Sequence, residues 1–357
     1  MHLKVEAGQH CENVRPHTDS SGASGRDKRQ CGALPLPTLN FDIMDTPNSS
    51  SLLDVIVVGG GAAGLSAALV LGRCLRRVLV CDVGNPRNAP ARVFNGYLSR
   101  DGSTPGEFLQ VSREQLRRYD TVELRTVRVD HAERGNRRFT VTLETGERIA
   151  ARMLLIATGL VDKLPAIEGF KQFYGKTAHN CPYCDGWEHR GQPVAVIGGT
   201  QEAADLAIEM LLWSKDVVLC TNGPLDCDTK ARTQMARCGV GIIETPIARL
   251  EGTGDALENV RFTDGTALPR TVLFFSPGQH QRSPLAEQLG CKFCDEDGCI
   301  QCDETAATGI PGLYAAGNAS RGVQLVIAAA AEGTLAAVAI NNALVEADAE
   351  SGELASS

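Results

Sequence analysis

The chain has 357 residues, of which 43% are hydrophobic and 22% charged, and its formal net charge is −8. This length suggests about two globular domains, and the negative charge argues against a nucleic acid or an anionic membrane surface as partner. The thirteen cysteines are an odd number in a long chain, which excludes a small secreted disulfide scaffold. No apolar leader follows Met1, so we predict a protein of the reducing cytoplasm.

The two ends of the chain differ from its middle. Residues 1–50 are polar, rich in glycine and serine and without periodicity, so we predict a disordered extension. Met44 precedes the first strong strand, and initiation at Met1 or at Met44 remains open. The apolar segment 323–340 is interrupted by Glu332, Gly333 and Thr334, which is typical of a buried helix rather than a membrane span. Residues 349–357 are expected to form a tail.

Residues 54–73, DVIVVGGGAAGLSAALVLGR, predict a strand, a glycine turn and a helix. Gly59 permits the tight turn, Gly61 lets the backbone approach a pyrophosphate, and Gly64 lets the helix pack closely on the strand. The next strand, RVLVCD, ends in Asp82, where an acid can accept a hydrogen bond from a ribose hydroxyl. This combination predicts dinucleotide binding, and the alternative is a glycine-rich turn in an ordinary α/β domain.

A second strand, turn and helix follow in QPVAVIGGTQEAADLAIEMLLWSKDVVLCTNG, residues 192–223. Gly198 and Gly199 open this turn and Ala203 closes it. Thr200 occupies the position of the second glycine, and no arginine stands where a 2′-phosphate would need one. The pattern predicts a nicotinamide site and leaves NADPH and NADH both open.

Two shorter signals complete the nucleotide-type pattern. Residues 154–160 predict an apolar strand that ends in Ala157-Thr158-Gly159. Residues 308–333 predict a turn, a short strand, Gly317-Asn318 and a helix of small residues, whose start near Gln324 could face a phosphate or an electron-rich ring. An ordinary core helix is the alternative.

Cys181 and Cys184 are separated by two residues in the stretch CPYCDG. Such a pair can close a disulfide over a short turn, and one of its thiols ionises more easily than an isolated cysteine. Disulfide exchange needs an attacking thiolate and a second thiol to resolve the mixed disulfide. A zinc knuckle and an idle reduced pair remain alternatives. His179 and His189 flank the pair and could be ligands, but we expect both at the surface.

A second cysteine cluster is GCKFCDEDGCIQCDE, with Cys291, Cys294, Cys299 and Cys302. Four thiolates suit a tetrahedral zinc ion. Zinc ribbons, however, separate their two pairs by about 15–20 residues, whereas here Cys294 and Cys299 follow each other closely. We therefore predict ordinary half-buried cysteines and no metal, with a zinc site or a second redox pair as alternatives.

The order GGGAAG, ATG, CPYCDG, second glycine turn and PGLYAAGN, from about residue 52 to 345, resembles the low-molecular-weight thioredoxin reductase family. The stretch HNCPYCDGWEHRGQPVAVIGG is most similar to a bacterial subgroup of thioredoxin reductase-like proteins. The resemblance implies an α/β fold of two Rossmann-like domains, the second inserted in the first. The FAD-binding domain would comprise residues 51–165 and 278–348. Residues 166–277 would form an NAD(P)-binding-like domain that carries the redox pair.

The resemblance also implies a function. Electrons would pass from NADPH or NADH through FAD to Cys181–Cys184 and then to a thioredoxin-like protein or a small-molecule disulfide, in a homodimer. Cys184 would face the flavin, and Asp185 would act as acid and base. The implied FAD residues are Gly59, Gly61, Gly64, Asp82, Thr158, Gly159, Gly317, Asn318 and Gln324, and the implied nicotinamide residues are Gly198, Gly199, Thr200 and Ala203.

One departure from the family concerns Asn318, since the family usually has aspartate there. Asparagine keeps an acceptor oxygen but loses the charge, so we expect FAD binding to be retained. Two alternative functions remain open at this point: a dithiol oxidase that passes electrons from the flavin to oxygen, and a non-catalytic flavin-binding redox sensor.

Overall fold

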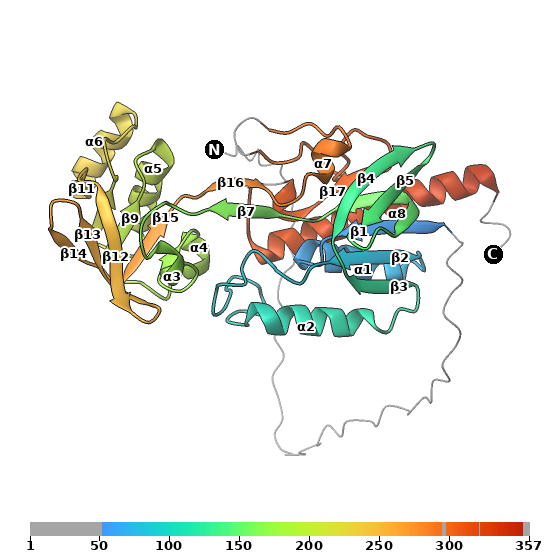
Figure 1. Cartoon of the computed structure of the whole chain (residues 1–357), viewed down its shortest axis with the longest axis horizontal. Helices are drawn as coiled ribbons and strands as arrows, with labels where there is room; N and C mark the ends of the chain where they lie inside the picture. Colours follow the sequence, from blue (N-terminus) through green and yellow to red (C-terminus); the bar gives the residue numbers. More distant parts are fainter. Residues whose placement is uncertain (1–51, 295–297, 321, 353–357) are drawn as a thin grey trace, which may run out of the picture. The chain divides into compact units, whose positions relative to one another are not determined.

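The computed structural model describes residues 52–294, 298–320 and 322–352 (Figure 1). The predicted N-terminal extension, with Met44, lies outside the described residues, as do residues 353–357 of the predicted tail. The described chain forms an α/β fold with one mixed sheet, one parallel sheet, one small antiparallel sheet and one two-stranded connection.

The first sheet is built around β1 (Leu53–Val58), whose last four residues are all buried. A strand that is buried on both faces must be apolar throughout, and the run Val55 to Val58 satisfies this requirement. The strand order is β3-β2-β1-β6-β5-β4, with β17 paired to β6. The other strands of this sheet are β2 (Val78–Asp82), β3 (Val122–Thr126), β4 (Val129–Gly135), β5 (Arg138–Leu143), β6 (Arg148–Ile156) and β17 (Leu313–Ala315).

Helices α1 (Ala62–Arg73) and α8 (Val326–Ser351) pack against each other beside this sheet. Gly333 of α8 is the point of closest approach, because a Cβ atom there would lie 1.9 Å from the carbonyl oxygen of Ala63. Helix α8 confirms the predicted helix of small residues, but it runs to Ser351 and so takes in part of the predicted tail.

Among the described residues, α8 is also the one helix long and apolar enough, by length and composition, to cross a membrane. Its most apolar window is 33% buried within the structure. Buried positions recur every three or four residues, at Ala330, Gly333, Ala337, Ile340, Leu344 and Asp348, with Ala336 buried beside Ala337. This periodicity is that of a helix with one face against a protein core.

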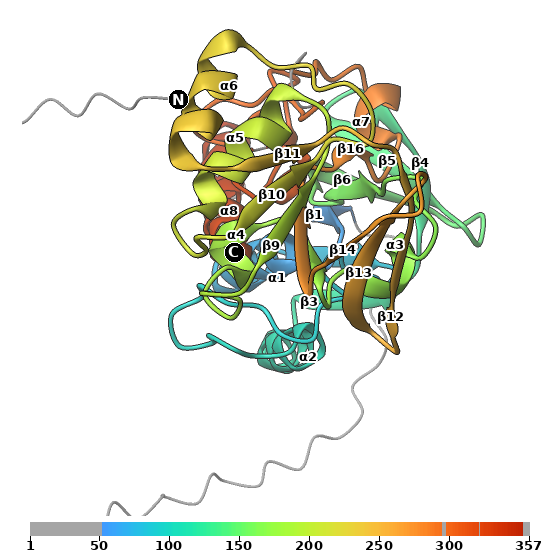
Figure 2. The ribbon, with the colours of Figure 1, turned by 90° about the vertical axis from the view of Figure 1, so that its left-hand side faces the viewer.

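The second sheet is parallel and has the order β11-β10-β9-β15-β8. Figure 2 shows its strands β11, β10 and β9 side by side. Its strands and the neighbouring helices are β8 (Ala178–His179), β9 (Val194–Ile197), β10 (Val217–Cys220), β11 (Gly241–Ile243), β15 (Val272–Phe275), α5 (Gln201–Met210) and α6 (Thr229–Cys238). An antiparallel sheet of β12 (Ile247–Thr253), β13 (Ala256–Phe262) and β14 (Ala267–Pro269) adjoins it in sequence. All these strands lie in sequence between β6 and β17 of the first sheet, so the predicted fold class is confirmed.

The two main sheets are joined by the antiparallel pair β7 (Leu160–Lys163) and β16 (Gly278–Gln281). Asp162 stands opposite Gln279 in this pair. The domain boundaries expected from the sequence, 165/166 and 277/278, fall directly beside these strands. The remaining helices are α2 (Pro105–Leu116), the single-turn helices α3 (Phe170–Phe173), α4 (Pro182–Asp185) and α7 (Leu285–Gln288), and the 3₁₀ turn η1 (Gly317–Ala319).

The contact between α1 and α8 makes a testable prediction. We expect Gly333→Ala to lower the free energy of unfolding by about 1–3 kcal/mol, because the new methyl group meets the Ala63 carbonyl. Gly106 in α2 is the matched control, since a Cβ atom there meets nothing within 4 Å. Gly106→Ala should raise stability by about 0.5–1 kcal/mol. Urea unfolding measures the free energy of unfolding of both variants. If both substitutions changed this free energy by the same amount and in the same direction, the close contact between α1 and α8 would be contradicted.

Candidate active site

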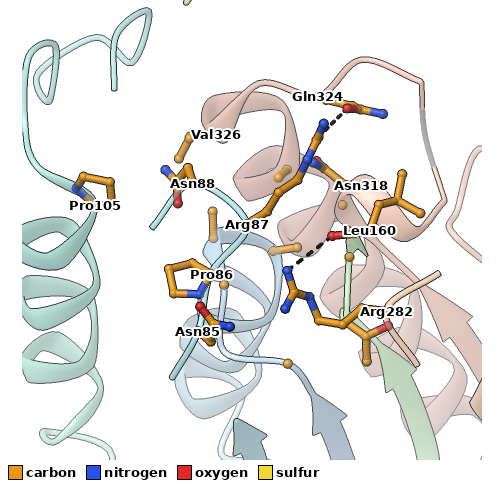
Figure 3. Close-up of a pocket in the computed structure, with 18 of the residues that line it drawn as sticks. Asn85, Pro86, Arg87, Asn88, Pro105, Leu160, Arg282, Asn318, Gln324 and Val326 are labelled. Atoms are coloured by element: carbon orange, nitrogen blue, oxygen red, sulfur yellow. Dashed lines mark hydrogen bonds between the residues drawn. The ribbon is translucent and has the colours of Figure 1, made fainter. Parts of the chain in front are cut away.

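A cavity of about 970 Å³ opens beside the carboxyl end of β1 (Figure 3). Its wall combines the glycine turn after β1, the loop of residues 83–95, the end of β6 and the CPYCD segment. Most of the predicted FAD residues and all predicted catalytic residues line it: Gly59, Gly61, Asp82, Thr158, Gly159, Cys181, Cys184, Asp185, Gly317, Asn318 and Gln324. The cavity also takes in Arg282, whose Nη2 donates to the carbonyl oxygen of Leu160 at 3.3 Å.

The three glycines of the first turn have different surroundings. Gly59 has φ +110°, and a Cβ atom there would lie 2.3 Å from the carbonyl oxygen of Ala157. A Cβ atom on Gly64 would lie 1.8 Å from the carbonyl oxygen of Gly59, so helix and turn touch at this point. Gly61 differs, because nothing lies within 4 Å of its Cβ position and the residue borders the cavity. The protein therefore needs Gly59 and Gly64 for its own packing, and leaves the space at Gly61 free for a ligand.

Two polar groups show that the cavity fits a dinucleotide such as FAD. The hydroxyl oxygen of Thr158 is buried and has no hydrogen-bond partner among the described residues. A buried polar group left unpaired costs about 1–3 kcal/mol, so this hydroxyl favours a polar ligand in the cavity. Asp82 borders the cavity at the end of β2 and accepts from Arg113 Nη2 at 2.8 Å. Sequence reasoning missed Arg113, which lies 31 residues away along the chain.

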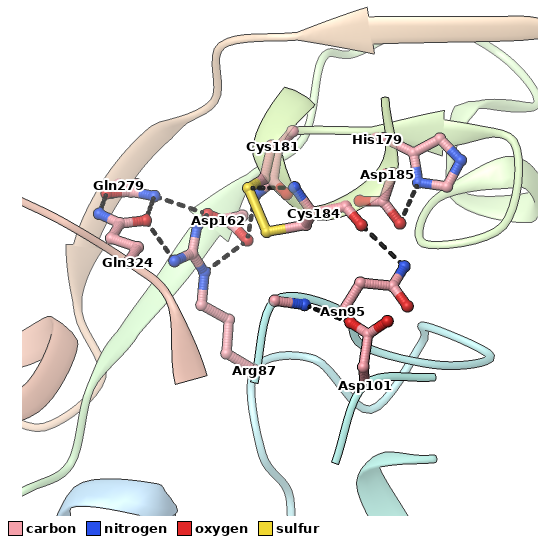
Figure 4. The surroundings of a disulfide bond; sticks show 12 residues. Arg87, Asn95, Asp101, Asp162, His179, Cys181, Cys184, Asp185, Gln279 and Gln324 are labelled. Atoms are coloured by element: carbon pink, nitrogen blue, oxygen red, sulfur yellow. Dashed lines mark hydrogen bonds and ion pairs between the residues drawn. A yellow bond between two sulfur atoms is a disulfide. The ribbon is translucent and has the colours of Figure 1, made fainter. Parts of the chain in front are cut away.

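Cys181 and Cys184 are joined in a disulfide whose Cα atoms lie 5.3 Å apart (Figure 4). Cys181 precedes the single-turn helix α4, and its sulfur accepts from the backbone N–H of Cys184 at 3.2 Å. Pro182 occupies the first helical position, where its missing N–H is not needed. From the loop of the first sheet, Asn95 Nδ2 donates to the carbonyl oxygen of Cys184 at 2.8 Å. The two cysteines thus lie in a short turn that is held by a hydrogen bond within the turn and by a second one from Asn95.

The surroundings of Asp185 correct one prediction. His179 is not at the surface: it is 7% exposed, because β8 pairs with β15 and brings its ring within 5.5 Å of the ring of Phe274. His179 Nδ1 lies 3.3 Å from Asp185 Oδ1, and His179 Nε2 lies 3.1 Å from His189 Nε2. His189 is half-buried, and its burial, followed by the proximity of His179, lowers its pKa below the usual range.

A second polar cluster, centred on Asp162 of β7, was not found from the sequence. Its carboxylate is 3% exposed and accepts from Arg87 at 2.5 and 2.8 Å, from Tyr174 Oη at 2.6 Å and from Gln279 Nε2 at 2.9 Å. Burial alone would raise the pKa of Asp162. The Arg87 guanidinium and the hydrogen bonds from Tyr174 and Gln279 have the larger, opposite effect, so the pKa lies below its usual value. Arg87 also donates to Gln324 (Figure 4). This cluster ties the β7–β16 connection to the cavity wall.

The Asp162 cluster should make stability depend on pH. Since the carboxyl pKa is lowered in the folded state, its contribution is fully present well above the ordinary value of about 3.9 and is lost as the pH falls through the folded pKa. At pH 7, Asp162→Asn should cost about 3 kcal/mol, because it leaves Arg87 without its counter-charge. Urea unfolding between pH 7 and pH 3.5 tests this expectation. If the difference in the free energy of unfolding between wild type and variant did not become smaller below pH 4, this expectation would be contradicted.

The predicted nicotinamide residues form the expected strand, turn and helix between β9 and α5. Gly198 has φ +147°, and a Cβ atom there would lie 2.7 Å from Ala203 Cβ. The carbonyl oxygen of Gly199 accepts from the N–H of Asp226 at 2.7 Å. Thr200 is exposed at the start of α5. None of the four lines the cavity described above, and their role in binding NAD(P)H stays a prediction.

The second cysteine cluster is packed rather than open. Cys291 and Cys299 are buried and Cys294 and Cys302 are half-buried, in agreement with the predicted burial. Residues 295–297, between the two pairs, lie outside the described residues. Among the residues that the structure does describe, no group of three or more His, Cys, Asp or Glu side chains is arranged to hold a metal ion.

Comparison with known proteins places this geometry in a family. The model of the pyridine nucleotide-disulphide oxidoreductase family matches residues 53–333. A probable thioredoxin reductase of Arthroderma benhamiae is 32% identical over 66% of this chain and 66% of its own length. Thioredoxin reductase sirT of Leptosphaeria maculans is 27% identical over 84% of this chain and 96% of its own length.

Solved structures agree in fold. The crystal structure of HlmI has a TM-score of 0.81 and 38% identity, and the match covers 85% of this chain and 96% of HlmI. A putative thioredoxin reductase TrxB from Bacillus anthracis has a TM-score of 0.78 and 30% identity, over 82% of this chain and 99% of its own. The chain therefore belongs to the pyridine nucleotide-disulphide oxidoreductase family, as a thioredoxin reductase-like, FAD-dependent disulfide oxidoreductase that uses NAD(P)H.

Proposed function

We propose that this enzyme reduces the disulfide of a thioredoxin-like protein or of a small molecule, with Cys181–Cys184 as the pair that exchanges with the substrate. The observation that carries the proposal is that this disulfide and the glycine turn at Gly61 line one and the same cavity. A ligand held by the turn would therefore share one cavity with the disulfide.

The residues that would hold FAD follow from the cavity. The free space at Gly61 and the N-terminus of α1 suit the pyrophosphate, and Asp82 suits a ribose hydroxyl. Thr158 and Asn318 offer further polar contacts from the wall. When bound, FAD exchanges electron pairs with a nicotinamide and with a disulfide. The proposed FAD-binding residues also include Gly159, Gly317 and Gln324, which line the cavity. Gly64 supports the turn by packing against Gly59.

The chemistry at the cysteines needs both electrons and protons. Two electrons break the S–S bond, and the two sulfurs then become a thiolate and a thiol once one proton is supplied. The thiolate attacks a substrate disulfide, and the second cysteine resolves the mixed disulfide and releases the reduced substrate. By its place directly after Cys184 and on the cavity wall, Asp185 is suited to hold and return that proton. We assign the flavin-facing position to Cys184.

We also propose the wider setting of the enzyme. The domain ranges would be 51–165 with 278–348 for FAD and 166–277 for the nicotinamide, and the enzyme would be a soluble cytoplasmic homodimer of the bacterial CPYCDG subgroup. The family match over residues 53–333 supports the two domains, and the CPYCDG stretch of the sequence supports the subgroup. Light scattering of the purified protein tests the homodimer, and a monomer at all concentrations would contradict it.

One pair of assays tests the direction of the reaction. With NADPH or NADH as donor, the enzyme should reduce an added thioredoxin, measured by loss of nicotinamide absorbance at 340 nm. In air, with dithiothreitol in place of the nicotinamide, oxygen consumption should stay slow. Fast oxygen consumption with dithiothreitol, together with no nicotinamide oxidation, would replace the proposal by a dithiol oxidase. Flavin binding without either activity would indicate a sensor.

A further inference from the structure

We propose that His179 and His189 act as a proton store for Asp185: together the two rings hold one exchangeable proton and refill it from solvent. The inference deepens the proposed function, because it rests on Asp185 as the acid of the Cys181–Cys184 pair. Its basis is a continuous line of nitrogen and oxygen atoms that begins beside the disulfide and ends at a half-exposed ring.

The line has three contacts. Asp185 Oδ1 lies 3.3 Å from His179 Nδ1, His179 Nε2 lies 3.1 Å from His189 Nε2, and His189 Nδ1 lies 3.4 Å from Gln192 Oε1. Figure 4 shows the His179 ring directed at the Asp185 carboxylate beside the disulfide. His179 is buried and borders the cavity, whereas His189 is half-buried. The pair therefore spans the distance from the cavity wall toward solvent.

Protons can be placed by the partners of each ring. Gln192 Oε1 only accepts, and Thr271 Oγ1 also lies 3.3 Å from it, so His189 carries a proton on Nδ1. Its Nε2 then offers a lone pair, which accepts from Nε2–H of His179. Since His179 also faces the Asp185 carboxylate with Nδ1, it carries a second proton there. The arrangement is one imidazolium, His179, between a carboxylate and a neutral imidazole.

The short contact between the rings limits the store to one proton. Two imidazolium rings would place two N–H groups head to head at 3.1 Å, which is repulsive. His189 is the ring that stays neutral, in agreement with its lowered pKa, to which burial and the proximity of His179 contribute. The other groups that face this ring are the carboxylates of Asp185 and Glu188, which favour its charged form, and the ring of Phe274.

The proposed step balances as follows. When two electrons break the Cys181–Cys184 bond, one sulfur leaves as a thiolate. Asp185 takes the Nδ1 proton of His179 and passes it to that sulfur, and the histidine pair becomes neutral. Before the pair can be refilled, each ring must move its remaining proton to its other nitrogen, so that His189 Nε2–H faces the lone pair of His179 Nε2. The pair then regains one proton from solvent through His189. Oxidation of the two thiols runs the same transfers in reverse. Asp185 is half-buried on the cavity wall, and without this connection it would exchange its proton only with water in the cavity.

The alternative is that the histidines only hold the turn at Asp185 in place. Four proteins distinguish the two roles: wild type, His179→Asn, His189→Asn and, as control, His131→Asn, which removes an exposed histidine of β4. The flavin-loaded proteins are reduced anaerobically with dithiothreitol, without nicotinamide. Acid quenching, alkylation and mass measurement then count the thiols formed at Cys181 and Cys184 over time, from pH 5.5 to 9.

At pH 7, we expect both His variants to form thiols about 10-fold more slowly than the wild type. This is a modest part of the roughly 10²–10⁴-fold effect of a general acid. The rate should also depend less steeply on pH in both variants. Imidazole added to His189→Asn should restore the rate in proportion to its concentration, because a free imidazole can deliver the proton to His179. The rates of wild type and His131→Asn should not respond to imidazole.

Wild-type rates and pH profiles in both His variants would overturn the proton store. Slow rates that imidazole does not restore would also overturn it, in favour of the positioning role. If His179→Asn fails to fold, His189→Asn and its rescue still decide the matter. The proposed function is tested separately. If NAD(P)H did not reduce the wild type, NAD(P)H would be refuted as electron donor, but the dithiothreitol result would still stand. If Asp185→Asn formed thiols at the wild-type rate, the assignment of Asp185 as the acid would be refuted.

Discussion

Replacing Cys184 by serine is expected to lower NADPH- or NADH-dependent disulfide reduction roughly 1,000-fold or more, while the protein stays yellow. The reason is that Cys181 alone can form a mixed disulfide with a substrate but has no second thiol to resolve it. The serine is nearly isosteric and leaves the cavity wall otherwise unchanged, so FAD binding should persist. The measurement is the thioredoxin-coupled rate, with the flavin content determined from the visible spectrum.

The control for this variant is Cys238→Ser, which removes an exposed cysteine at the end of α6. Its rate should match the wild type, since an exposed thiol far along the chain from the CPYCD turn takes no part in the exchange. If Cys184→Ser kept wild-type turnover with a normal flavin content, the assignment of the redox pair would be wrong.

Replacing Gly61 by valine is expected to remove the flavin without unfolding the protein. The Cβ position of Gly61 meets nothing within 4 Å, and its backbone is extended, with φ −79° and ψ −170°, so a branched side chain is tolerated by the fold. The side chain enters the space that a pyrophosphate needs, so flavin occupancy should fall roughly 10-fold or more. Absorbance at 450 nm per chain measures the occupancy, and circular dichroism measures the fold.

Gly135→Val is the matched control, because the Cβ position of this glycine of β4 has only ordinary contacts, the nearest at 3.6 Å. It should purify with the same flavin content as the wild type. If Gly61→Val also remained fully yellow, the pyrophosphate would not lie against the first glycine turn, and the proposed FAD site would have to move.

Much of the fold could be predicted because its signals are local. The buried run Val55 to Val58 followed directly by Gly59 needs only the steric rules of one strand and one turn. The same holds for Gly198 after β9 and for the CPYC turn, in which Cys181 and Cys184 are three positions apart. Their order along the chain then indicated the family, and with it the insertion of one sheet between the strands of the other.

The rest of the site depends on pairing between distant segments. Asp162 and Gln279 are 117 residues apart and meet only because β7 and β16 align in one register. His179 was expected at the surface, but the parallel pairing of β8 with β15 places it beside Phe274 and buries it. A sequence pattern of single polar residues carries no signal of such registers, so the charged cluster around Asp162 and the histidine pair were found only in the structure.

The most direct test of the account is an anaerobic titration of the flavin-loaded protein with NADPH or NADH, followed by alkylation and mass measurement. The flavin and the Cys181–Cys184 disulfide each take two electrons, so wild type should consume two equivalents of nicotinamide and end with both cysteines alkylated, whereas Cys184→Ser should consume one. Flavin bleaching complete at one equivalent in the wild type, with the disulfide still intact, would contradict electron transfer between the cavity and this pair.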